Sequence, residues 1–116
     1  MILHTEVMSQ HLLVTQTASR WRLSGLIDFE PAMRGGREYE FAAVGVFVAE
    51  GDARFLTRTL TAYGYSREEL GPELRRRLLA GSILHRYSNL VAWLRRLPEP
   101  AEPTLGALAD RWFATE

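Results

Sequence analysis

The chain has 116 residues, a formal net charge of zero, 47% hydrophobic residues and 24% charged residues. This size and composition are typical of one folded globular domain, and the lack of a basic surplus argues against nucleic-acid binding. Cysteine is absent, which excludes disulfides, thiol nucleophiles and thiolate metal sites, and all fourteen basic side chains are arginine.

The first predicted element is a β-hairpin. Two apolar, partly alternating runs, residues 11–15 and 20–27, are joined by the polar residues 16–19. After a proline and a pair of glycines, the largely apolar segment from residue 37 to about residue 50 predicts a helix that is buried on most of its surface.

Three further helices are expected after the first one. Asp52 is a candidate N-cap for a helix that stops at Gly64. An apolar stripe at helical spacing predicts one long helix from residue 74 to about 97. The proline-rich residues 98–103 form an extended connector, after which Thr104 can cap a last helix.

The predicted fold is therefore α+β and mostly helical, with an N-terminal hairpin followed by about four helices. We expect a single domain over residues 1–116, divided into a hairpin segment at 4–30 and a helical subdomain at 37–116.

A polar cluster on the long predicted helix has two interpretations. His85, Arg86, Tyr87 and Asn89 are suitable for lining a substrate cleft. A core histidine with satisfied hydrogen bonds beside a tyrosine is the commoner arrangement, and the sequence favours it.

The strongest chemical signal lies at the base of the hairpin. Because antiparallel strands reverse direction, the residues that enter the first strand and those that leave the second meet at one edge. Glu6, His11 and Asp28 are therefore expected to converge. Two carboxylates at such an edge can position a hydroxyl nucleophile and a divalent cation, as phosphoryl transfer requires, although acidic residues at hairpin ends are more often solvated turn residues.

Three segments also resemble one enzyme family, in order and at suitable spacings. Residues 4–14 (HTEVMSQHLLV) are similar to the catalytic loop of aminoglycoside and choline kinase relatives, whose pattern is H-G-D, then N and a short strand. Residues 25–30 (GLIDFE) resemble that family's second strand with its metal-binding Asp, and residues 35–42 (GGREYEFA) its G-D-x-x-Y-[DE] segment. The resemblance is strong from about residue 4 to 42 and looser in the helices.

The resemblance implies a role for five residues. Asp28 matches the Asp that binds Mg²⁺ between the terminal phosphates. Glu6 occupies the position of the catalytic Asp, and its side chain is one methylene longer. His11 occupies the position of the second metal ligand, which is an Asn in the family, although imidazole is a poor partner for Mg²⁺. His4 matches the histidine that anchors the loop, and Glu40 an acidic residue that serves the helix N-terminus and ties the preceding loop.

The implied activity is transfer of the ATP γ-phosphoryl group, with Mg²⁺, to a hydroxyl of a small molecule such as an aminoglycoside, a reaction of antibiotic resistance. The resembled part is the C-terminal lobe of a protein-kinase-like phosphotransferase, and we expect the N-terminal nucleotide lobe to be absent. The phosphate-gripping lysine of that lobe has no candidate here, because the chain has no lysine.

Two functional hypotheses remain open: a phosphotransferase lobe, and a non-catalytic binding or oligomerisation module derived from it. Because the resembled family packs further helices against this region, the long apolar stripe and the helix at 37–50 are expected to be uncovered and to drive homodimerisation or binding of a separate lobe. No apolar run approaches the roughly 18 residues of a membrane span, and a signal-peptide pattern is lacking, so the sequence predicts a cytoplasmic protein.

Overall fold

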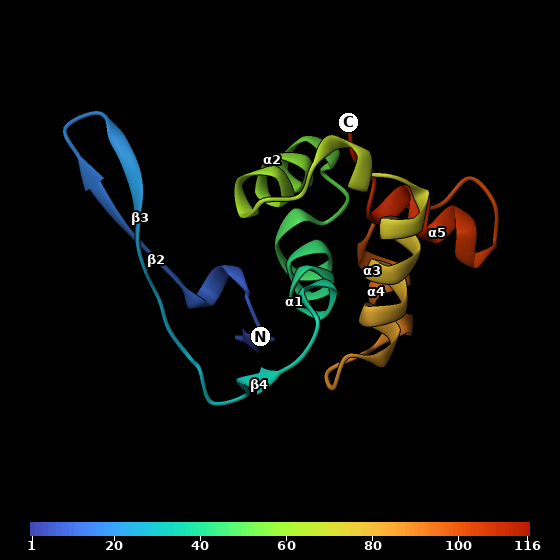
Figure 1. Ribbon diagram of the computed structural model, residues 1–116, viewed down its shortest axis with the longest axis horizontal. Coiled ribbons are helices and arrows are strands. Elements are labelled where there is room, and N and C mark those ends of the chain that lie inside the picture. The colour runs from blue at the N-terminus through green and yellow to red at the C-terminus, as the bar shows by residue number, and fades with distance from the viewer.

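The computed structural model describes residues 1–116 and has an α+β, mostly helical fold. The helical part lies beside two short antiparallel strand pairs (Figure 1). The strands are β1 (Ile2–Leu3), β2 (Leu12–Thr17), β3 (Arg20–Leu26) and β4 (Met33–Arg34). The helices are α1 (Arg37–Val44), α2 (Ala53–Tyr63), α3 (Pro72–Leu84), α4 (Leu90–Arg96) and α5 (Leu105–Trp112).

The predicted hairpin is confirmed as the β2–β3 pair. Its register runs from Leu12 opposite Leu26 to Thr17 opposite Arg20, with an irregularity after Leu13. The hairpin extends away from the helices, and its base leads on one side to the N-terminus and on the other to β4 (Figure 1). β1 pairs with β4, so both chain segments that leave the hairpin are held together before α1 begins.

Local signals placed three helices correctly. The first expected helix is observed as α1, which continues as a π-helical turn over Gly45–Ala49. At α2, the Asp52 side chain accepts a hydrogen bond from the Phe55 N–H, and Gly64 ends the helix with a φ of 118°. At α5, the Thr104 hydroxyl accepts from the Ala107 N–H.

The long helix expected from residue 74 to 97 is wrong, because the chain breaks into α3 and α4. His85 is extended, with a ψ of 138°, and its ring Nε2 lies 2.6 Å from the Thr5 carbonyl oxygen. Asn89 then starts α4 by accepting a hydrogen bond from the Ala92 N–H. A tertiary contact and an N-cap thus interrupt an apolar stripe that continues through the break.

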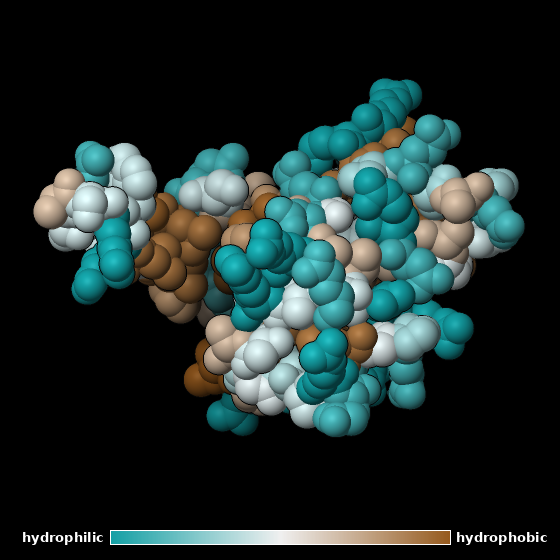
Figure 2. Space-filling model, turned by 90° about the horizontal axis from the view of Figure 1, so that it is seen from above, coloured by the Kyte–Doolittle hydropathy of each residue, from teal (hydrophilic) through white to brown (hydrophobic).

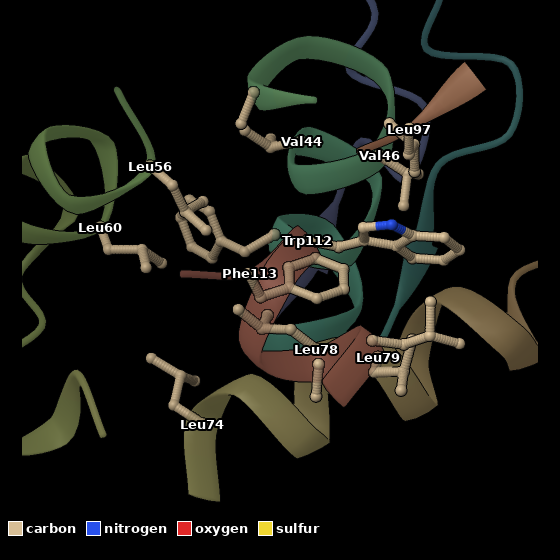
Figure 3. Close-up of a cluster of buried hydrophobic side chains, with 14 of the residues drawn as sticks. Val44, Val46, Leu56, Leu60, Leu74, Leu78, Leu79, Leu97, Trp112 and Phe113 are labelled. Atoms are coloured by element: carbon tan, nitrogen blue, oxygen red, sulfur yellow. The ribbon is translucent and has the colours of Figure 1, made fainter. Parts of the chain in front are cut away.

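The core lies where the helices meet around the C-terminal end of α5. Trp112 and Phe113 are 1% and 0% exposed, and leucines of α2 and α3 surround them (Figure 3). The Trp112 indole N–H also donates to the Pro98 carbonyl, at 2.9 Å, which ties the proline-rich connector to the core. α1 packs against α3, and α3 packs against α5.

The structure confirms the expected exposure of apolar helix surface only in part. The apolar face of α1 and the first part of the stripe, on α3, are buried within this chain, as at Phe41 and Leu74, whereas the stripe is exposed on α4 at Val91 (61%) and Leu94 (49%). Exposed apolar side chains also lie on the hairpin, where Trp21 is 68% and Leu23 66% exposed. Figure 2 shows a hydrophobic area beside the hairpin. No helix is both long enough and apolar enough to span a bilayer.

Tyr65 gives a test of the packing between α1 and the segment after α2. Its hydroxyl is buried without a hydrogen-bond partner, and burial raises the pKa of Tyr65 from 10.0 to about 12. A raised native pKa means that the native state keeps its proton longer than the unfolded state does, so stability is present below pH 10 and lost as the pH rises towards 12. Tyr65→Phe should therefore be neutral or stabilising at pH 7. Urea unfolding between pH 9 and 12 should show a smaller loss of stability in Tyr65→Phe than in the wild type. An equal loss in the two proteins would contradict this prediction.

Candidate metal and phosphoryl-transfer site

The loop after β1 is held by a carboxylate from α1. Glu40 accepts two backbone hydrogen bonds, from the His4 N–H at 2.5 Å and from the Thr5 N–H at 3.0 Å. Hydrogen bonds to a charged acceptor are stronger than neutral ones. The side chain of Glu40 therefore fixes the direction in which the chain continues to Glu6.

Thr5 is the strained point of this loop. It is fully buried and has a φ of 72°, which is an outlier for a β-branched residue. Its hydroxyl donates to the Pro31 carbonyl at 3.0 Å, and its own carbonyl accepts from the His85 ring. The hydrogen bonds of Thr5 thus hold a conformation that glycine, the residue of the H-G-D pattern, adopts without strain.

His4 connects the loop to the exit of the hairpin. Its Nδ1 accepts from the Glu6 N–H at 3.3 Å, so the proton of the neutral ring lies on Nε2, which donates to the Ile27 carbonyl at 2.7 Å. The ring also packs edge-on against Phe29. Both nitrogens are used in these contacts, and the ring is buried, so His4 is not free to act on a ligand.

Glu6, His11 and Asp28 come together at the base of the hairpin. One donor atom from each side chain lies within 4.8 Å of the other two. His11 Nε2 is 3.2 Å from an Asp28 carboxylate oxygen. The Glu6 and His11 side chains are half-buried, whereas Asp28 is exposed, so the cluster opens to solvent on the Asp28 side.

The backbone presents these side chains from two connected segments. The 3-10 helix Ser9–His11 ends directly before β2, and Asp28 follows β3 by two residues. The Ile27 N–H donates to the His11 carbonyl at 3.0 Å, which joins the two segments one residue before Asp28. Asp28 has a φ of 66°, a left-handed conformation that Asp tolerates better than most residues and that occurs often at functional sites.

The donor set suits a divalent cation but does not match Mg²⁺ well. Glu6 and Asp28 offer carboxylate oxygens, and none of the chain's ion pairs joins either of them to an arginine. Mg²⁺ prefers oxygen ligands only, and the third donor here is an imidazole nitrogen. The two carboxylates thus fit the cation that the family pattern implies, and His11 does not.

His85 supports the site from the far end of the sequence, a role that the sequence did not reveal. It is 3% exposed and stacks on Tyr39 with ring centroids 5.0 Å apart. Its Nδ1 accepts from the Tyr87 N–H and its Nε2 donates to Thr5, so the prediction of a satisfied core histidine is confirmed. Its bond to a residue 80 positions away has no local sequence signal.

The comparisons with known proteins identify a family for the chain. The model of the phosphotransferase enzyme family matches residues 1–80, which include Glu6, His11, Asp28 and the loop-holding Glu40. No curated protein and no solved structure gives a significant match. On the family match, which covers well over half of its length, this chain belongs to the phosphotransferase enzyme family.

Proposed function

We propose that the chain provides the metal-binding and acceptor-binding side of a phosphotransferase that moves the γ-phosphoryl group of ATP to a hydroxyl of a small molecule. The observation that carries the proposal is the convergence of Glu6, His11 and Asp28 within 4.8 Å in a chain of this family. Aminoglycosides are the acceptor class that the sequence resemblance suggests.

Each residue has a defined task in this proposal. Asp28, with His11, holds a divalent cation, which would neutralise charge on the terminal phosphates. Glu6 orients the acceptor hydroxyl and takes its proton while the acceptor oxygen bonds to the γ-phosphorus and ADP departs. Glu40 positions Glu6 through the backbone of His4 and Thr5.

Phosphate binding requires a further cationic group. The sequence contains no lysine, so the group that grips the phosphates is an arginine of this chain or a residue of another polypeptide segment. The proposal therefore includes a partner, either a nucleotide-binding lobe or a second copy of the chain, whose contact surface is the exposed apolar hairpin around Trp21 and Leu23.

A second candidate function is a non-catalytic binding or oligomerisation module built on the same lobe. Two observations favour it: Glu6 is longer than the Asp of the family pattern, and the hairpin leaves apolar side chains uncovered. A displacement of a catalytic base by about 1 Å can reduce a rate by about a hundredfold. The module would keep the hairpin and the cluster of Glu6, His11 and Asp28 at its base, and would use them for binding without phosphoryl transfer.

An assay of acceptor-dependent ADP release separates the two functions. The protein is given ATP, Mg²⁺ or Mn²⁺, and a panel of aminoglycosides. The phosphotransferase proposal expects release that falls about a hundredfold or more in Asp28→Ala, because even outer-shell changes at metal sites cost about 10- to 100-fold.

The matched control for this assay is Asp110→Ala, which removes a carboxylate that is 62% exposed and lies outside the cluster. It should leave ADP release unchanged. Release that Asp28→Ala does not reduce would contradict the assigned site, and the absence of acceptor-dependent release would contradict catalysis and favour the binding module.

A further inference from the structure

We infer that the corner formed by Glu6, His11 and Asp28 selects a first-row transition cation that accepts imidazole, such as Mn²⁺ or Zn²⁺, over Mg²⁺. The inference rests on the proposed function, because it names the cation of the same site. It departs from the Mg²⁺ that the family pattern implies, and the departure comes from one residue, His11.

The orientation of the His11 ring is the first argument. Its Nδ1 lies 2.6 Å from the Glu6 carbonyl oxygen, which can only accept a hydrogen bond, so Nδ1 carries a proton. In the neutral ring the lone pair is then on Nε2, which faces Asp28. A histidine that donates one ring N–H to a backbone carbonyl and presents the other nitrogen is the usual arrangement of a metal-binding histidine.

The spacing of the donor atoms is the second argument. His11 Nε2 and the Asp28 oxygen are 3.2 Å apart. Two ligands that each lie roughly 2.0–2.1 Å from a tetrahedral Zn²⁺ are roughly 3.3 Å apart. A cation can therefore enter between these two side chains with little movement, and the Glu6 carboxylate, within 4.8 Å of both, completes the set by a side-chain rotation.

The charge of the cluster is the third argument. Glu6 and Asp28 together carry two negative charges when ionised, and no arginine pairs with either of them, although the chain has fourteen arginines. Two carboxylates and one imidazole suit Mn²⁺ and Zn²⁺, whereas Mg²⁺ gains little from the nitrogen donor.

Pulsed electron paramagnetic resonance of bound Mn²⁺ tests the inference without any activity measurement. The expected result is a ¹⁴N coupling from imidazole in the wild-type protein and its disappearance in His11→Asn, which offers an oxygen donor instead. Competition supplies a second readout: Mg²⁺ should displace Mn²⁺ from His11→Asn at a concentration about tenfold or more below that needed for the wild type.

Two variants keep the outcomes distinct. Asp28→Ala should abolish binding of Mn²⁺ at this site, and Asp110→Ala should not. If Mn²⁺ binds and needs Asp28 but shows no nitrogen coupling, His11 is not a ligand, and the inference fails while the metal corner of the proposed function stands.

If the wild type binds no Mn²⁺, both the inference and the assignment of a metal site to Glu6, His11 and Asp28 fail. Because the wild-type spectrum alone decides whether nitrogen coordinates the cation, the test does not depend on the folding of His11→Asn.

Discussion

Replacing Gly45 by alanine is expected to lower the free energy of unfolding by about 3 kcal/mol or more, the upper part of the range for overpacking a core. A Cβ atom at Gly45 would lie 2.2 Å from Cε1 and 2.7 Å from Cδ1 of the Phe113 ring. Phe113 is fully buried, so the ring has no free space to move into. The gain in helix propensity, about 1 kcal/mol, is too small to offset this overlap.

Chemical denaturation of Gly45→Ala and of a matched control measures this effect. Gly106→Ala lies in α5, where the nearest atom to a new Cβ is 4.0 Å away, and it should be neutral or slightly stabilising. Phe113→Ala alone should cost about 3–5 kcal/mol. The double variant should cost less than the sum of the two single changes, because the alanine methyl group enters the vacated space; additive effects would show that the two residues do not contact each other.

Replacing Glu40 by alanine is expected to lower the free energy of unfolding by about 3 kcal/mol, since two hydrogen bonds to a charged group, each of about 1.5–3 kcal/mol, are lost. The donors are backbone N–H groups of His4 and Thr5, both of which are buried. Glu40→Gln should have about half the effect, because its amide keeps one acceptor oxygen and turns its NH₂ group towards the other donor.

Glu40→Ala should also weaken cation binding, because the loop that it releases leads directly to Glu6. The control is Glu73→Gln, because the side chain of Glu73 is 83% exposed. Thermal unfolding with and without Mn²⁺ measures both the loss of stability and the loss of cation binding. A Glu40 variant that keeps the stability of the wild type and its full stabilisation by Mn²⁺ would contradict the positioning role.

The parts of the fold that the sequence predicted correctly depend on local physics. Residues only a few positions apart determine each of these features, which are the Asp52 and Thr104 caps, the helix end at Gly64 and the alternation of the hairpin. The break between α3 and α4 was missed because its cause is partly tertiary: the His85 ring bonds to Thr5, and the apolar stripe gives no sign of it.

The candidate site was likewise predicted where local geometry determines it and missed where tertiary contacts do. Hairpin geometry and the family pattern predicted that Glu6, His11 and Asp28 converge, and their donor atoms lie within 4.8 Å. The strained backbone of Thr5 depends on contacts with Pro31, Glu40 and His85, which come from three separate segments. The burial of the α1 face and the exposed apolar side chains of the hairpin were not predicted, because periodicity identifies apolar faces but not the elements that cover them.

Calorimetric titration of the protein with Mn²⁺ tests the central claim, that the base of the hairpin is a cation site, most directly. The result expected is one cation bound per chain by the wild type and by Asp110→Ala, with no binding at this site in Asp28→Ala. Absence of binding in the wild type, or binding that Asp28→Ala leaves unchanged, would contradict the account.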